Sequence, residues 1–343
     1  FGENAFEVDK SIKVSRPENT KKVVKKEKVD SSSYNALELY KLKKINQPKL
    51  LEPFLQNIGL ASLVGESDSG KSTFLRQLCL AIVLKDEIFL DYKINSKHNK
   101  VIYVSTEDNV ESTSFLLRKQ VEILHPKIDN DKLALLENLE FIFETDDLFS
   151  SLDKRLKKNP VDLIVLDAFT DIFTKEINSN TQVRAFLNKY DQLAKRNNCL
   201  ILVLHHTGKR TQNNKVSKDN IIGSQGFEAK MRVVLELRGN NASSQKDLWV
   251  LKSNFLSSAY KNKSYSLDFS TNFIFTNTGL RGSQQSNSKY NDIELKKKVI
   301  SLHKEGHPVR KIEELLKNTE FKTSKSTAGL IIKEHNLKEK GGN

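Results

Sequence analysis

The clearest indication of the fold is the segment Gly65-Glu66-Ser67-Asp68-Ser69-Gly70-Lys71-Ser72. It matches the phosphate-binding pattern G-x-x-x-x-G-K-[ST] at every fixed position, between an apolar run at 60–64 and a helix-like stretch at 72–83. The two glycines let the backbone curl so that successive amides face phosphate groups, and the helix directs its positive end at them. The sequence therefore predicts a nucleoside triphosphate site made by these residues together with Thr73.

Within that site the residue types predict separate roles. Lys71 is expected to reach the β- and γ-phosphates, and the Ser72 hydroxyl to ligate Mg²⁺. A second apolar run, 163–166, ends in Asp167, and an aspartate in this place of a P-loop fold holds Mg²⁺ through water. We therefore expect ATP and Mg²⁺ as cofactors, with Ser72 and Asp167 as the metal residues.

Two more apolar runs lead into polar residues that suit hydrolysis. One run is followed by Glu107 and Asp108, either of which would polarise the attacking water; Glu107 is the preferred base. Another run ends at His205 and His206, where an imidazole would sense the γ-phosphate, and His206 is preferred. Paired histidines also ligate zinc, but no cysteine or further histidine lies near them in the sequence.

Short apolar runs alternate with amphipathic stretches through most of the chain, which predicts an α/β fold with a doubly wound, mostly parallel sheet. The expected strands are 60–64, 101–104, 139–143, 163–166, 200–204, 233–237 and 249–251, with antiparallel additions at 265–269 and 272–275. The expected helices are 72–83, 112–123, 147–157 and 180–196.

Composition divides the 343 residues into four parts. Residues 1–45 predict a basic, largely disordered tail, 46–278 the α/β domain, 279–290 a linker, and 291–343 a small all-α domain. In the last part, helices are expected at 293–304, 309–316 and, with a polar cap, from Thr323 onward. This pattern resembles the helix-turn-helix of resolvase-type and related regulators, which implies duplex DNA binding. The alternative is a small helical domain for oligomerisation or partner docking.

The net charge, the apolar runs and the cysteines limit the class of protein to which the chain can belong. The formal net charge of +13 favours polyanionic partners such as nucleic acid. No apolar run approaches the roughly 20 residues that a membrane span needs, so no membrane partner is expected. Cys79 and Cys199 lie in apolar segments and are expected to be reduced core residues, as in a cytoplasmic protein.

The ordered motifs together resemble the RecA-like ATPases, in particular the RepA-type plasmid replicative helicases. The resemblance covers about 46–278 and adds two late runs, Gly223-Ser224-Gln225-Gly226-Phe227 and Lys252-Ser253-Asn254-Phe255. It implies a hexameric ring with ATP between subunits and single-stranded DNA in the channel. It implies Glu107 as base and His206 as sensor, with Arg232 and Lys252 as cations completing the neighbouring subunit's site. Related helicases often carry an arginine where this chain has Asn254, so the arginine acting in trans stays open.

These observations predict an ATP-dependent DNA helicase or translocase of a plasmid or mobile element. The basic, polar segment 209–220 is expected to contact single-stranded DNA in the ring channel. Two alternatives stay open: a DNA-binding regulator or loader that uses ATP as a slow assembly switch, and a recombinase-like filament former.

Overall fold

The computed structural model describes residues 33–41, 48–208, 215–223, 225–239, 245–283, 293–317, 319 and 321–340. The chain divides into two compact units, 1–46 and 47–343. Within the first unit the structure describes the short helix α1 (Ala36–Lys41), which buries none of its residues. Apart from 33–41, the basic tail predicted at 1–45 lies outside the described residues.

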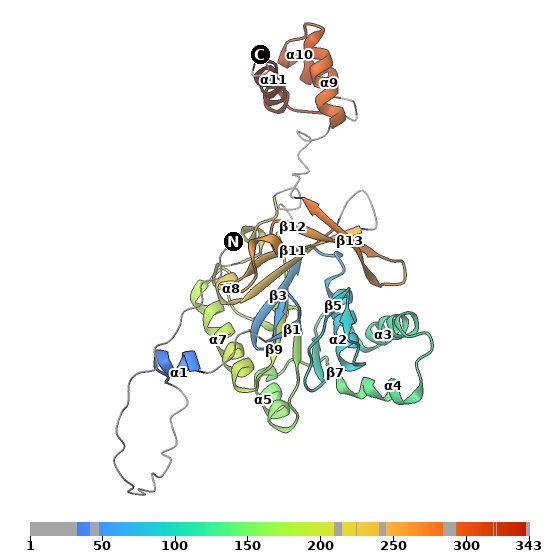
Figure 1. The fold of residues 1–343 in the computed structure, drawn as a ribbon, viewed down its shortest axis with the longest axis vertical. Helices are drawn as coiled ribbons and strands as arrows, with labels where there is room; N and C mark the ends of the chain where they lie inside the picture. The colour runs from blue at the N-terminus through green and yellow to red at the C-terminus, as the bar shows by residue number, and fades with distance from the viewer. Residues whose placement is uncertain are drawn as a thin grey trace, which may run out of the picture. The chain divides into compact units, whose positions relative to one another are not determined.

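A mixed sheet organises the second unit (Figure 1). Within the described residues it has nine strands in the order β13-β12-β11-β10-β3-β9-β8-β6-β7. The parallel part contains β7 (Leu139–Ile142), β6 (Val101–Ser105), β8 (Leu163–Asp167), β9 (Leu200–His206), β3 (Gly59–Gly65) and β10 (Val233–Gly239). The antiparallel part adds β11 (Gln245–Ser253), β12 (Lys263–Phe269) and β13 (Phe275–Ser283).

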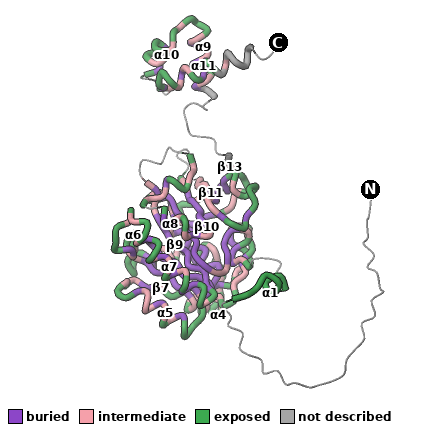
Figure 2. The backbone as a smooth tube through the Cα atoms, turned by 90° about the vertical axis from the view of Figure 1, so that its left-hand side faces the viewer, coloured by how far each residue is buried: buried purple, intermediate pink, exposed green. Residues whose placement is uncertain are grey.

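Helices cover both faces of the parallel part, so its strands are buried on both sides (Figure 2). In β8, Leu163 and Val165 belong to the core that includes α2, whereas Ile164 and Leu166 belong to the core that includes α5 and α7. The first face carries α2 (Lys71–Val83), with α3 (Val110–Leu124) packed beside it, and the second carries α5 (Leu148–Lys158) and α7 (Asn180–Arg196). The predicted doubly wound, mostly parallel α/β fold is confirmed.

Smaller elements connect these layers. They are β1 (Lys49–Leu51), β2 (Leu55–Gln56), β4 (Ile88–Phe89), β5 (Tyr92–Lys93), α4 (Asn130–Ala134), α6 (Phe169–Ile172) and α8 (Gln225–Lys230), with 3₁₀ turns at Leu135–Asn138, Lys218–Asn220 and Ser258–Tyr260. None of the helices in the described part of the chain is long and apolar enough to cross a membrane.

The late strands differ from the prediction. Of the strand expected at 272–275, residues 272–274 are instead the turn between β12 and β13, and only Phe275 begins a strand. In this turn Phe273 has a φ of +61° and donates its amide to the Ser270 carbonyl. β13 then runs to Ser283, into the predicted linker, because Gly282 pairs with Ser264. A Cβ on Gly282 would lie 2.4 Å from the Ser264 hydroxyl oxygen, so this glycine permits a close approach of strands.

The C-terminal residues form three helices, α9 (Ile293–Lys304), α10 (Val309–Leu316) and α11 (Lys325–Lys340). They share a core of their own that includes Leu295, Val299, Ile312 and Ile331. Ser324 caps α11, since its hydroxyl accepts a hydrogen bond from the Thr327 amide.

Candidate functional site

The predicted phosphate-binding loop connects β3 to α2. Gly70 has a φ of +92° and Asp68 one of +60°, so the loop turns through conformations that side-chain-bearing residues rarely adopt. A Cβ on Gly65 would lie 2.3 Å from the Leu237 carbonyl oxygen, and one on Gly70 would lie 2.9 Å from the Phe275 ring. Among the described residues no side chain caps the amides that begin α2. Both positions therefore lack the space for a side chain, and the first amides of the helix stay available to bind an anion.

Lys71 points back across this loop. Its ammonium group donates to the Glu66 carbonyl at 2.5 Å, and the residue is only 5% exposed. Burial lowers the pKa of Lys71, while Glu107, Asp167, Asp68 and Glu66 oppose that shift electrostatically. The ammonium group thus interacts electrostatically with Glu107 and Asp167, which the sequence predicts as the base and the metal ligand.

Asp167 ends β8 beneath the loop. Tyr103 of β6 donates its hydroxyl to Asp167 Oδ2 at 2.5 Å, whereas Oδ1 is buried and has no hydrogen-bond partner among the described residues. Burial raises the pKa of Asp167 to about 6, against hydrogen bonds from Tyr103 and Ser72 that lower it. The open oxygen of Asp167 and the hydroxyl of Ser72, which hydrogen-bonds to the same carboxylate, are both oxygen ligands. Oxygen ligands of this kind suit a magnesium ion.

Glu107 and His206 meet at the same edge of the sheet. Glu107 Oε1 lies 3.2 Å from His206 Nε2, although the two residues belong to the ends of different strands, β6 and β9. The hydrogen bond from His206 lowers the pKa of Glu107, partial burial opposes that shift, and Lys71 adds to the lowering. A carboxylate that stays ionised near a lysine and a phosphate loop can accept a proton from water.

The neighbouring acid, Asp108, is engaged elsewhere. Its carboxylate pairs at 3.2 Å with the guanidinium group of Arg76, which is 2% exposed in α2. Of the two acids predicted after β6, the structure therefore leaves Glu107 facing Lys71 and His206.

The two histidines point in opposite directions, as consecutive residues of a strand do. His205 is fully buried, packs on Phe169 and Phe227, and donates from Nε2 to the Ile222 carbonyl at 2.9 Å. Burial lowers the pKa of His205 to about 4. His205 is a core residue, and the pair does not converge on one metal ion.

Thr106 connects the segments that carry Glu107 and Asp167, a role that no sequence pattern predicted. Its amide and hydroxyl both donate to the Asp167 carbonyl, at 2.7 and 2.9 Å. Its hydroxyl also contacts Asp171 at 2.6 Å and accepts from the Ala168 amide at 2.9 Å. Glu107, the next residue, is thereby held in a fixed relation to Asp167.

Arg232 and Lys252 lie at the other edge of the sheet. Arg232 donates its amide to the Leu60 carbonyl, at the start of the strand whose far end carries the loop. Lys252 binds Glu228, with contacts to its carbonyl at 2.8 Å and its carboxylate at 3.0 Å. The structure therefore does not bring these two cations to the phosphate-binding loop of their own chain.

Sequence reasoning missed Tyr103, Arg76 and Thr106. Tyr103 lies in an apolar strand, and Arg76 lies in a helix whose other buried side chains are mostly apolar. Such patterns predict a core residue or a surface residue, not a residue of the functional site. The register of β6 and β8, which sets Ser105 beside Asp167, brings Tyr103 and Thr106 to the predicted site, and Arg76 reaches it through its ion pair with Asp108.

The strand order, the loop between β3 and α2, and the carboxylates on neighbouring strand ends define a RecA-like P-loop ATPase. A family model described as an AAA domain matches residues 37–212, just over half of the chain, and the chain belongs to this family.

Individual relatives share smaller parts of the chain. DNA repair protein RadA of Rickettsia felis is 29% identical over 160 residues, 45% of this chain and 30% of that protein. DNA repair protein rhp57 of Schizosaccharomyces pombe is 25% identical over 156 residues, 41% of each chain. This chain thus spans well under half the length of these curated relatives. A solved structure of an ATPase domain aligns with a TM-score of 0.48 and 11% identity, over 64% of this chain and 85% of that one.

Proposed function

We propose that this ATPase hydrolyses ATP with Mg²⁺ in the cytoplasm and uses the energy to move along single-stranded DNA. The observation that carries the proposal is the set of groups around Lys71: the unpartnered oxygen of Asp167, the Ser72 hydroxyl, and the pair formed by Glu107 and His206. They match the needs of phosphoryl transfer, which are phosphate binding, metal binding and orientation of water.

Each residue has a distinct task in this mechanism. Lys71 leaves the Glu66 carbonyl to bind the β- and γ-phosphates, while the amides of 65–73 surround them. Ser72 and Asp167 would hold Mg²⁺, which neutralises charge developing on the phosphate oxygens. Glu107 orients and deprotonates water, and His206 links it to the γ-phosphate, so that loss of that phosphate is felt at the end of β9.

A ring, expected to be hexameric, would complete the site. Arg232 and Lys252 lie at the edge of the sheet opposite to their own loop, so they serve catalysis only by reaching the nucleotide of a neighbouring subunit. Such a cation offsets charge on the transferring phosphoryl group.

Mixing two defective proteins tests this arrangement. Lys71→Ala should abolish nucleotide binding in its own subunit, and Arg232→Ala should abolish hydrolysis in the next one. Mixed rings contain some interfaces with both residues intact, so ATPase activity should partly return. No recovery at any mixing ratio would exclude Arg232 as the cation in trans, and the same test then applies to Lys252.

Two segments are proposed to contact DNA, and the names of the RadA and rhp57 relatives, DNA repair proteins, support this class of partner. The segment 209–220 follows the end of β9 and returns at the bridge between Thr207 and Ile221, so it is anchored at the γ-phosphate side. Residues 209–214 lie outside the described part.

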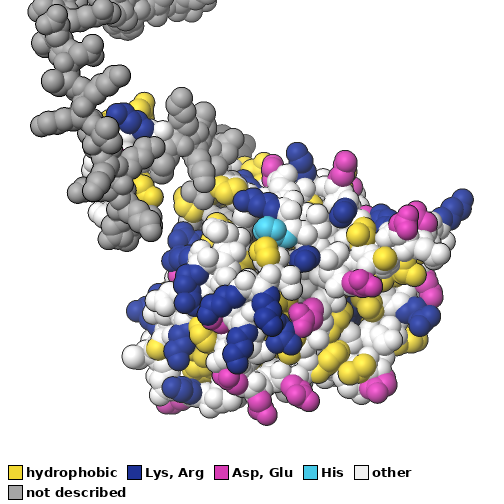
Figure 3. Space-filling view, turned by 90° about the horizontal axis from the view of Figure 1, so that it is seen from below, with side chains coloured by type: hydrophobic (Ala, Val, Ile, Leu, Met, Phe, Trp, Pro, Cys, Tyr) yellow, Lys and Arg dark blue, Asp and Glu magenta, His cyan; other side chains and the backbone are white. Residues whose placement is uncertain are grey.

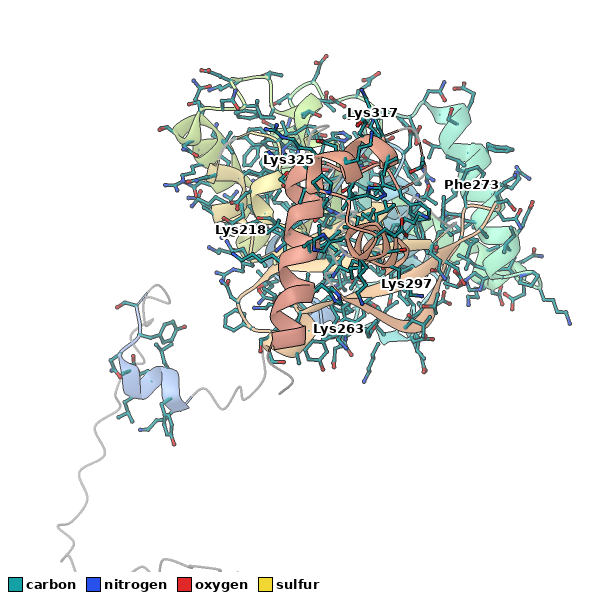
Figure 4. The ribbon with its side chains drawn as sticks, turned by 90° about the horizontal axis from the view of Figure 1, so that it is seen from above. Lys218, Lys263, Phe273, Lys297, Lys317 and Lys325 are labelled. Atoms are coloured by element: carbon teal, nitrogen blue, oxygen red, sulfur yellow. The ribbon has the colours of Figure 1, made fainter. Side chains whose placement is uncertain are left out.

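The C-terminal helices are proposed to form a helix-turn-helix that binds duplex DNA. Lys297, Lys317 and Lys325 are exposed on three successive helices or their ends (Figure 4). By contrast, the face in Figure 3 mixes both signs of charge. Some basic residues of α5 and α7 are paired, as in Lys157 with Asp153 and Lys195 with Asp191. We assign no DNA to that face.

The deciding experiment compares ATPase rates with single-stranded DNA, duplex DNA and no DNA, followed by strand displacement on tailed duplexes of both polarities. A helicase of a plasmid or mobile element should be stimulated most by single strands and should displace the tailed strand. Stimulation by duplex alone, with no displacement, would instead support the alternative of a DNA-binding loader that uses ATP as an assembly switch.

A further inference from the structure

A buried tyrosine hydroxyl lies directly beneath the proposed metal site. Tyr103 is 1% exposed in the middle of β6, and its ring packs on Phe141 at 5.3 Å. We propose that Tyr103 is a positioning residue, which fixes the Asp167 carboxylate so that one defined oxygen faces the metal ion. This inference rests on the proposed Mg²⁺-dependent nucleotide binding.

The hydroxyl touches both elements that would hold the metal. It donates to Asp167 Oδ2 at 2.5 Å and lies 3.5 Å from the Ser72 carbonyl oxygen, so β8 and the first turn of α2 meet at one atom. The shorter contact is a hydrogen bond to a carboxylate, a strong class, whereas the longer one fixes little by itself.

The two oxygens of Asp167 therefore differ. Oδ2 is occupied by Tyr103, and Oδ1 is buried without a partner among the described residues. A carboxylate free to rotate would turn its open oxygen toward any donor, because an unsatisfied buried oxygen is costly. With Oδ2 held, Oδ1 alone stays open for the ion, so the metal ligand is set before the ion arrives.

The backbone of Asp167 is held as well, which isolates the contribution of Tyr103. Thr106 binds the Asp167 carbonyl through its amide and hydroxyl. Removing the Tyr103 hydroxyl should therefore leave the carboxylate group with the Ser72 hydrogen bond alone, while its main chain stays in place. An ordinary core tyrosine would show no such effect, and Tyr190 of α7, buried against the other face of the sheet, offers the matched control.

The test measures metal binding without turnover. A fluorescent ADP analogue is titrated onto wild type, Tyr103→Phe and Tyr190→Phe, first with a chelator and then with increasing Mg²⁺. Tyr103→Phe should need about tenfold more Mg²⁺ for half-maximal enhancement of binding, as expected for a partner behind a metal ligand, with metal-free affinity within about twofold of wild type. Tyr190→Phe should match wild type in both measurements. In the Asp167→Asn background, Tyr103→Phe should have no further effect on the Mg²⁺ requirement.

Two results would overturn the inference: an unchanged Mg²⁺ requirement in Tyr103→Phe, or an equal loss of metal-free affinity, which would indicate a purely structural role. If Tyr103→Phe does not fold, Phe141→Leu loosens the ring and keeps the hydroxyl, and it should raise the Mg²⁺ requirement by a smaller factor; no rise would count against the proposal. If wild type itself shows no Mg²⁺-dependent binding, the proposed function fails and not merely the role of Tyr103.

Discussion

Two buried aspartates at opposite edges of the parallel sheet differ in their hydrogen bonding. At the edge where the strands end, Asp167 Oδ1 and His206 Nδ1 have no hydrogen-bond partner among the described residues. At the edge where the strands begin, Asp162 accepts three backbone amides, from Lys97, His98 and Asn99, at 2.7 to 2.9 Å. Asp167 thus keeps one oxygen open, whereas Asp162 is satisfied by backbone amides.

This difference separates binding from support. Buried polar groups are almost always hydrogen-bonded, so those left open need a reason, and a ligand that supplies the missing partners is one. A hydrogen-bonded group such as Asp162 stabilises the fold instead. Substitutions at the first edge should therefore change catalysis more than stability, and substitutions at the second should do the reverse.

The largest effect is expected at Glu107. Glu107→Gln keeps the size of the side chain but cannot accept a proton, so ATP hydrolysis should fall by roughly 10³-fold, the usual contribution of a general base. Nucleotide affinity should stay within about threefold, since Lys71 and the loop amides do the binding. Single-turnover hydrolysis and equilibrium binding measure the two quantities separately.

Glu111→Gln provides the control, because Glu111 is an exposed acid in the first turn of α3. Its ATPase rate should equal that of wild type. Comparable rates for Glu107→Gln and wild type would remove Glu107 as the base and would weaken the contrast between the edges at its strongest point.

A smaller effect is expected at His205, which lies at the open edge but points into the core. Its pKa is lowered to about 4 in the folded chain, so the unfolded chain binds the extra proton at higher pH. The stability that this neutral histidine contributes is complete above about pH 6.5 and is lost as the pH falls toward 4, by about 3 kcal/mol.

Urea unfolding at pH 7 and pH 4.5 measures this loss, with His205→Gln as the comparison. Glutamine does not titrate, so the variant should lose less stability than wild type over the same interval. Equal losses in both proteins would show that other groups cause the acid sensitivity.

The same contrast explains how far the sequence could predict the structure. Local patterns suffice where one strand or one turn carries the signal, as in Gly65–Ser72 and in the doubly buried run that ends at Asp167. The roles of Arg232 and Lys252, the base Glu107 and the domain boundaries stay predictions.

Other features depend on contacts between segments far apart in the chain, which no local pattern contains. Tyr103 and Asp167 are 64 positions apart and meet only through strand register. The apolar run at 272–275 suggested a strand, but the turn at Phe273 is set by packing of the hairpin on α2, where Gln77 binds the Phe275 backbone in both directions at 2.8 and 2.9 Å.

The smallest effect is expected at Asp162, at the edge where the strands begin. Asp162→Ala removes the acceptor of three amides in 97–99 and should lower the free energy of unfolding by about 2 kcal/mol, since donors are left unpaired. The loop at 97–99 lies at the opposite ends of the strands from Lys71, so the KM for ATP and the Mg²⁺ requirement should not change well below the unfolding temperature. A shift of either constant at that temperature would mean that the edge where the strands begin also shapes the nucleotide site, and that satisfied polar groups do not mark a region without function.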